Sequence, residues 1–214
     1  MLLAFDTSTP ATVVAVATSD GTLLAEGRHD PAEGERPGHT TQLLARAETA
    51  LAQAGAGWPD VARLGVGIGP GGFTGLRVGL ATGRALAAAL GAETVPLLSL
   101  DVLASGEMGT ALISVIDARR AEVFVRAYDG NGQPEGEARV TEPAALDGAG
   151  RLAVGDGAVR YRRILGELGL VVPGDEDPRH LIQGAALALM TASARPAPLL
   201  PAYLREPDAQ PRQG

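Results

Sequence analysis

Apolar runs and short polar turns alternate through the first thirty residues. The run at 2–5 is continuously apolar, as in a buried central strand, and it ends at Asp6. Two further runs, at 12–18 and 21–28, are joined through Asp20 and Gly21, and Asp-Gly between apolar runs is a strong hairpin signal. The chain is therefore predicted to open with three strands.

The pattern changes to a helical period after a polar loop at 29–38. Between His39 and Ala54, one face of the predicted helix carries His39, Leu43, Leu44, Ala47, Ala50, Leu51 and Ala54. Gly55 follows as a helix-ending residue. An apolar strand at 64–69 then leads through a glycine-rich loop into a second helix at about 75–90. The first half thus reads as three strands, a helix, a strand and a helix.

The second half has a similar order of elements. It contains predicted strands at 111–117, 121–130, 137–141 and 151–157, followed by helices near 158–168 and 178–194. This order predicts a duplicated, mixed α/β architecture. We expect an N-terminal lobe over residues 1–100, with the two helices of the first half, and a smaller C-terminal lobe and tail over residues 101–214.

Composition and charge narrow the classes of function. The net charge is −7, so the chain lacks the overall positive field that drives unaided binding to nucleic acid; any RNA is expected to be held through a partner. The absence of cysteine excludes disulfides and thiolate chemistry. The three histidines include no pair four residues apart, so no metal site is expected. With no signal-peptide pattern and no membrane-length apolar run, the cytoplasm is the expected location.

The stretch "GPGGFTGLR" at 69–77 allows two interpretations. A glycine-rich turn before a helix can present backbone N–H groups to a phosphate, but the spacing matches neither a P-loop nor a dinucleotide-binding fingerprint. In the helix that follows, Gly75, Gly79 and Gly83 recur every four residues and leave one face nearly without side chains. This stripe indicates close approach of a neighbouring strand or of another chain, and packing is the favoured interpretation.

A second candidate site is the loop "DTSTP" after the first strand. Asp6 is a candidate for orienting a water bound to Mg²⁺, and the loop ends in the rigid Pro10. The candidate nucleotide or anion contacts are Asp6, Ser8, Gly71, Gly72 and Thr74. The simpler interpretation of Asp6, which we favour, is a carboxylate that caps a turn. In the second half, Asp117, Arg119 and Arg120 predict a salt-bridged hairpin.

Several of these segments together resemble the bacterial TsaB (YeaZ) family. "GPGGFTGLRVGLATGRALA" is similar to that family's GPGSFTGLRIG segment, and "LLAFDTST", "GHTTQLLARAETAL", "DARRAEVFVRAYDG", "VGDGA" and "PAYLREP" resemble its other motifs. Gly72 departs from the family's usual serine, which would remove any ligand contact made by that hydroxyl. Arg84 also departs, since an Ala-Lys pair is usual nearby.

The resemblance implies an α/β fold of the actin/Hsp70/sugar-kinase (ASKHA) type, with two β-β-β-α-β-α lobes of which the second is degenerate. It further implies a non-catalytic scaffold or activator that pairs with TsaD, and with the ATPase TsaE, to form N6-threonylcarbamoyladenosine at position 37 of tRNA. The resemblance also implies that the chain has no cofactor of its own, although ATP or ADP can bind at the interface with TsaD. It implies that the chain contacts tRNA only indirectly and forms homodimers when alone.

The same resemblance places the partner interface on the first two helices. The residues so implied are His39, Leu43, Leu44, Ala47, Leu51, Gly75, Gly79, Gly83 and Arg84. Two alternatives remain: a glycoprotease resembling peptidase family M22, since relatives of TsaD were once grouped so, and an independent ATP-dependent enzyme of the same fold. The first needs a metal pair or an activated nucleophile, and the second needs intact phosphate loops.

Overall fold

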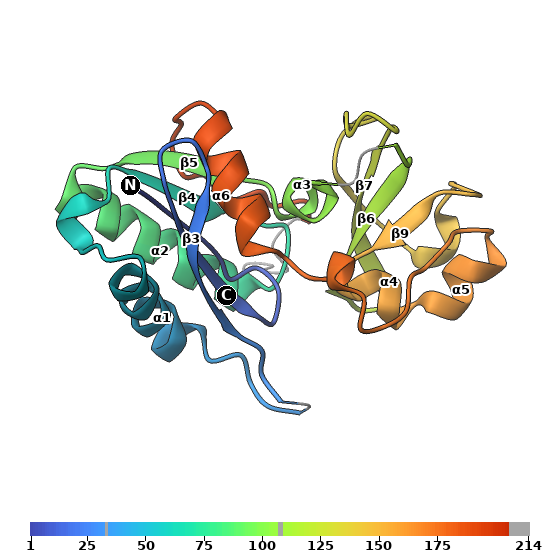
Figure 1. The fold of residues 1–214 in the computed structure, drawn as a ribbon. Coiled ribbons are helices and arrows are strands. Elements are labelled where there is room, and N and C mark those ends of the chain that lie inside the picture. Colours follow the sequence, from blue (N-terminus) through green and yellow to red (C-terminus); the bar gives the residue numbers. More distant parts are fainter. Residues whose placement is uncertain (33, 107–108, 206–214) are drawn as a thin grey trace, which may run out of the picture.

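The protein consists of two β-sheets with helices on both sides of each and a shared core between them (Figure 1). The structure is a computed structural model, and it describes residues 1–32, 34–106 and 109–205. The strands are β1 (Leu2–Asp6), β2 (Thr12–Ala17), β3 (Leu23–His29), β4 (Arg63–Gly67), β5 (Glu93–Leu97), β6 (Leu112–Arg119), β7 (Glu122–Tyr128), β8 (Arg139–Thr141) and β9 (Leu152–Val154).

The chain contains six α-helices among the described residues. They are α1 (His39–Gln53), α2 (Phe73–Leu90), α3 (Ser99–Ala104), α4 (Asp156–Arg160), α5 (Arg162–Glu167) and α6 (Gly184–Ser193). Short 3₁₀ helices occur at η1 (Trp58–Asp60), η2 (Pro143–Ala145) and η3 (Pro178–His180). In the described part of the chain, no helix is both long enough and apolar enough to cross a membrane.

The two sheets repeat one connectivity. The first has the order β3-β2-β1-β4-β5, with β1 antiparallel to β2 and parallel to β4. The second has the order β8-β7-β6-β9, with β6 antiparallel to β7 and parallel to β9. The predicted duplication is therefore present. The second lobe is degenerate: among the described residues, a single parallel bridge between Leu152 and Val171 takes the place of β5, and the helices on its outer face, α4 and α5, are short.

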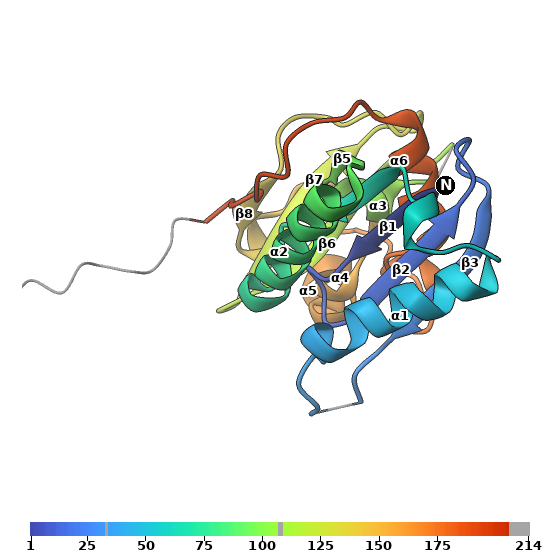
Figure 2. The same ribbon diagram turned by 90° about the vertical axis from the view of Figure 1, so that its left-hand side faces the viewer.

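Helices α1 and α2 cover one face of the first sheet, as Figure 2 shows. Every residue of β1 and β2 is buried, which explains their nearly uninterrupted apolar sequences. The core on this side joins Leu3, Phe5 and Val66 of the sheet to Leu43 of α1 and Leu76 of α2. The face of each helix that points away from the sheet is exposed.

The opposite face of the first sheet meets the second lobe through α3 and α6. Leu187 and Ala188 of α6 and Leu100 of α3 are fully buried in one core that also contains Ile116 and Phe124 of the second sheet. The guanidinium of Arg63 donates to Ala192 O at 3.4 Å and to Ala194 O, which satisfies carbonyls at the end of α6. The lobes therefore share a core. A separate core lies between the outer face of the second sheet and helices α4 and α5.

The final described segment, residues 194–205, runs as an extended strap between the lobes. Ala197 N donates to Thr94 O at 2.9 Å, Ala202 N donates to Ile68 O at 2.9 Å, and Arg205 Nη1 donates to Ala118 O at 3.1 Å. The predicted lobes, residues 1–100 and 101–214, differ from this arrangement in one respect. Helix α6 and the strap follow the second lobe in sequence, but they pack mainly on the first sheet because the apolar face of α6 covers it.

Several predicted elements need correction. Strand β5 and helix α3 were not predicted, and the helix expected at 158–168 is two short helices, with Tyr161 between them at φ −107°. The last helix begins at Gly184 instead of 178, since Pro178 opens a 3₁₀ turn.

Candidate functional site

The loop after β1 is held together by a buried carboxylate. Oδ1 of Asp6 accepts hydrogen bonds from Ser8 N and Ser8 Oγ, each at 2.7 Å, and Oδ2 accepts one from Ser99 Oγ at 2.6 Å. The two serine hydroxyl oxygens lie 2.8 Å apart. Asp6 is 1% exposed, and both serines are buried. The carboxylate therefore closes a turn and fixes α3 to β1, which agrees with the favoured interpretation of Asp6.

The glycine-rich loop closes over this turn. Gly72 N donates to Ser8 O at 2.6 Å, and a Cβ atom added to Gly71 would lie 2.2 Å from the same oxygen. Glycine is required at Gly71 because only a residue without a side chain allows the two backbones to approach so closely. Gly72 and Thr74 lie on the surface, whereas Asp6 and Ser8 do not.

The predicted nucleotide-contact residues are thus divided between two environments. Asp6 and Ser8 bond to each other inside the protein, so the expectation that both contact a nucleotide is corrected. Gly71 is half-buried against Ser8. For the exposed Gly72 and Thr74, the contact remains a prediction.

The glycine stripe of α2 faces the loop after β1 and the first sheet of this chain. A Cβ atom on Gly75 would lie 2.1 Å from Thr7 O, one on Gly79 would lie 2.4 Å from Thr7 Oγ1, and one on Gly83 would lie 2.8 Å from Val66 Cγ2. Thr7 Oγ1 also donates to Gly75 O at 2.8 Å. The sequence left open whether the stripe packs against a strand of this chain or against another chain. The structure shows packing within this chain. These three glycines are not a partner surface.

The apolar stripe of α1 is buried as well. Leu43, Ala47 and Leu51 pack against the first sheet, and His39 is buried with its Nδ1 2.8 Å from Thr12 Oγ1. Burial lowers the pKa of His39, and the Asp6 carboxylate opposes this in part. The prediction that these four residues contact a partner is thus corrected, because they lie on the face of α1 that packs against the first sheet.

Two predicted interface residues do reach the surface. Leu44 is 45% exposed on α1. Arg84 is exposed on α2, but its guanidinium donates to Leu199 O, with Nε at 3.2 Å, and so holds the strap against the helix. Small side chains make up much of the rest of the exposed face of the two helices, although Glu48, Gln53, Phe73 and Arg77 are exposed as well. We call one part of this face the α1–α2 outer face; it comprises Thr40, Leu44, Ala45, Glu48, Thr49 and Ala52 of α1 and Thr74, Ala81, Ala85, Ala88 and Ala89 of α2.

Two exposed aromatic rings were missed by the sequence analysis. Phe73, the first residue of α2, and Tyr203 of the strap have ring centroids 6.2 Å apart. The guanidinium carbon of Arg77 lies 3.7 Å from the centroid of the Phe73 ring. The spacing of Phe73 and Arg77, one helical turn apart, was a signal for the contact between those two residues, but not for the neighbouring Tyr203.

The second lobe brings two of the noted segments together. Asp156 Oδ1 accepts a hydrogen bond from Asp117 N at 3.0 Å, and burial raises the pKa of Asp156. The Asp117 carboxylate pairs with Arg119 at 3.1 Å and with Arg160 at 3.5 Å. The predicted ion pair of the β6–β7 hairpin is therefore confirmed for Arg119. These contacts tie the hairpin to the start of α4.

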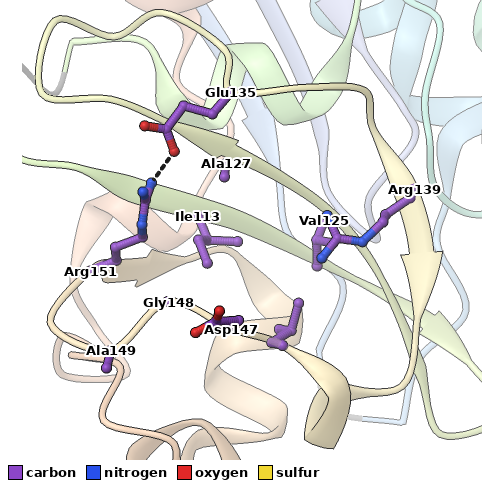
Figure 3. Close-up of a pocket in the computed structure, with 10 residues that line it drawn as sticks. Ile113, Val125, Ala127, Glu135, Arg139, Asp147, Gly148, Ala149 and Arg151 are labelled. Atoms are coloured by element: carbon purple, nitrogen blue, oxygen red, sulfur yellow. Dashed lines mark ion pairs between the residues drawn. The ribbon is translucent and has the colours of Figure 1, made fainter.

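A cavity of about 380 Å³ lies on the outer face of the second sheet (Figure 3). Ile113, Val125 and Ala127 form its apolar floor, and an ion pair of 2.6 Å between Arg151 and Glu135 crosses one side. No residue of this cavity was singled out in the sequence. No group of three or more His, Cys, Asp or Glu that could hold a metal ion occurs among the residues that the structure describes.

Comparison with known proteins places these features in context. Residues 31–154 match the family model described as TsaD, tRNA N6-adenosine threonylcarbamoyltransferase. The chain is 36% identical over 210 residues to the uncharacterized protein Rv3421c of Mycobacterium tuberculosis, covering 98% of this chain and 94% of that protein. It is also 36% identical over 145 residues to the Escherichia coli tRNA threonylcarbamoyladenosine biosynthesis protein TsaB, covering 64% of this chain and 59% of that protein.

Solved structures agree with the fold. A crystal structure from Pseudomonas aeruginosa, of a protein with similarity to peptidase YeaZ, has a TM-score of 0.76 and 27% identity, covering 95% of this chain and 99% of that one. The activator of 2-hydroxyisocaproyl-CoA dehydratase from Clostridium difficile has a TM-score of 0.51 and 10% identity, covering 89% and 94%. The predicted ASKHA-type fold is confirmed.

Proposed function

This chain belongs to the TsaB (YeaZ) family, and from that membership we propose that it is the accessory subunit that pairs with TsaD to form N6-threonylcarbamoyladenosine on tRNA. The observation that carries the proposal is the match of residues 31–154 to a threonylcarbamoyltransferase family model, together with relatives that are named as TsaB. The chain thus has a role in the biosynthesis of this modified nucleoside, and the transfer itself is assigned to TsaD.

The contacts of the β1 loop support an accessory role. In kinases and ATPases of this fold, the loop has to admit phosphate groups, whereas here Ser8 O is covered by Gly71 and Gly72, and the Asp6 carboxylate is bonded by two hydroxyls. A serine peptidase activates its hydroxyl through a histidine that a carboxylate orients. Here the serine hydroxyls bond directly to Asp6, and the imidazole of His39 bonds to Thr12. Both alternative functions are therefore less well supported.

We assign the contact with TsaD to the α1–α2 outer face. Its alanine and threonine side chains allow a partner helix to approach to the 8–10 Å between axes at which helices pack. Leu44, 45% exposed, supplies an apolar side chain at this face. The same face would form a homodimer when TsaD is absent, and TsaE would join the assembly as a third subunit.

A nucleotide, ATP or ADP, is proposed at the interface with TsaD and not in a site of this chain alone. Gly72 and Thr74 are exposed at the start of α2, at the edge of the proposed interface, and are the residues of this chain that we expect nearest to the nucleotide. Residues from two chains would then complete the site.

The test of the proposed function is reconstitution with purified TsaD, TsaE and the enzyme that forms the threonylcarbamoyl adduct. Omitting this chain should abolish or strongly reduce formation of the modified nucleoside. Equal formation without it would refute the proposal.

The proposed interface is tested by a variant with Leu44→Arg and Ala85→Arg. It should fold normally, because both positions are exposed, and it should no longer co-elute with TsaD. The matched control is Leu189→Arg on α6, an exposed leucine of the other helical layer, which should retain co-elution. Binding that survives in the double variant would refute the assignment of this face.

A further inference from the structure

The two half-exposed aromatic rings lie at the junction of the lobes. Phe73 is 52% exposed and Tyr203 is 48% exposed, in a chain with only three Phe, three Tyr and one Trp. Arg77 on the Phe73 ring holds it in place by a cation–π contact. Two exposed aromatic rings side by side offer flat faces on which a planar ligand can stack.

The strap connects this pair to arginines of the second lobe. Two residues beyond Tyr203, Arg205 pairs with Glu122 and donates to Ala118 O, which places the strap on the β6–β7 hairpin. At the tip of that hairpin, Arg119 shares Asp117 with Arg160 of α4. We call the set of Phe73, Arg77, Tyr203, Arg119 and Arg160 the aromatic–arginine surface.

The charge that this surface presents to solvent is positive. The side chains of Arg119 and Arg160 are 70% and 55% exposed, whereas that of Asp117, which they share, is 5% exposed. The guanidinium groups therefore point outward over a buried carboxylate. In a chain whose net charge is −7, such a surface is a local exception.

We infer that the aromatic–arginine surface binds a single-stranded loop of RNA, with an unpaired base stacked on the Phe73–Tyr203 pair and phosphates on Arg119 and Arg160. Stacking on aromatic rings with arginine contacts to the backbone is the usual way in which proteins hold unpaired nucleotides. The inference rests on the proposed function, which supplies a tRNA substrate. Because the whole chain is acidic, TsaD would recruit the tRNA and this surface would add a direct contact.

A protein partner fits this surface less well. The α1–α2 outer face already offers TsaD small and apolar side chains, whereas the aromatic–arginine surface offers flat rings beside exposed guanidinium groups. Charge complementarity to a polyanion favours RNA.

The experiment measures tRNA binding to the complex of this chain with TsaD by fluorescence anisotropy. A Phe73→Ala, Tyr203→Ala double variant should weaken binding at least about tenfold, within the range of roughly 5- to 150-fold for one stacked base. Leu189→Ala, which removes an exposed apolar side chain from α6, is the matched control and should bind as the wild type does. An unchanged dissociation constant in the double variant would overturn the inference.

A charge variant gives an independent measure. Arg119→Gln should lower the slope of log affinity against log salt concentration by about 0.7, the value for one phosphate contact on a single strand. Unchanged slope would count against the phosphate contact. If the double variant instead loses TsaD at normal thermal stability, the surface is a protein interface and the RNA assignment is wrong. Failure of this inference can be distinguished from failure of the proposed function, because in the second case the wild-type chain would not support modification in the reconstituted reaction.

Discussion

Gly75→Ala is the most informative single change in α2. In an ordinary helix, replacing glycine by alanine stabilises by about 1 kcal/mol. At Gly75, however, the new Cβ would lie 2.1 Å from Thr7 O and 2.8 Å from His39 Nε2. One of these contacts is with the backbone, so α2 has to move away from the β1–β2 loop. Overpacking of this kind typically costs about 1–3 kcal/mol, and sometimes more.

We expect a net loss of about 1–2 kcal/mol in the free energy of unfolding of the Gly75→Ala variant. For a chain of this size that corresponds to a fall of about 2–8 °C in melting temperature. The assay is urea denaturation followed by circular dichroism, with thermal denaturation as a second measure.

Gly166→Ala is the matched control. Gly166 lies in α5, and a Cβ there would meet nothing within 4 Å, so alanine should stabilise by about 0.5–1 kcal/mol. If Gly75→Ala is as stable as the wild type or more so, the stripe does not pack internally, and an interface role for it would have to be reconsidered.

Three other changes test separate parts of the account. Burial lowers the pKa of His39 from its ordinary value of 6.5, so the stability that the neutral imidazole contributes is complete above about pH 6.5 and is lost as the pH falls further. The drop in the free energy of unfolding between pH 7.5 and pH 5.5 should therefore be smaller in His39→Gln than in the wild type. An equal drop would contradict this. Ser114 Oγ is buried without a hydrogen-bond partner among the described residues, so Ser114→Ala should leave the urea midpoint unchanged or raise it; a loss above about 1 kcal/mol would show a missed partner. Gly155→Ala should lose at least about 2 kcal/mol, because φ is +111° and its Cβ would lie 2.2 Å from Val115 O; near wild-type stability would refute this close approach.

Much of the fold could be predicted from the sequence, because periodicity marks long elements clearly. The predicted α1 differs from the observed helix by one residue, and the opening three strands are present. Strand β5, which was not predicted, contains Pro96, a residue that is uncommon in strands and is tolerated here because β5 lies at the edge of the sheet. Helix α3 has only six residues, too few to reveal a period.

The candidate site was harder to predict, for a physical reason. An apolar or glycine stripe indicates that something covers a helix face, but not whether the cover is the chain's own sheet or another protein. On α1 and α2, the stripe through Leu43 and Gly79 meets this chain's own residues, and the outer face carries small side chains that no periodicity distinguishes from ordinary surface. The Phe73–Tyr203 pair joins residues far apart in sequence, so only the three-dimensional structure reveals it.

The central claim is tested most directly in Escherichia coli depleted of its own TsaB. The measurement is the N6-threonylcarbamoyladenosine content of total tRNA by mass spectrometry of nucleosides, with this chain or its Leu44→Arg, Ala85→Arg variant supplied, together with the chain's cognate TsaD. The account predicts that the wild-type chain restores the modified nucleoside and that the variant, at equal protein level, does not. Equal restoration by both would contradict the proposed interface, and no restoration by the wild-type chain would contradict the proposed function.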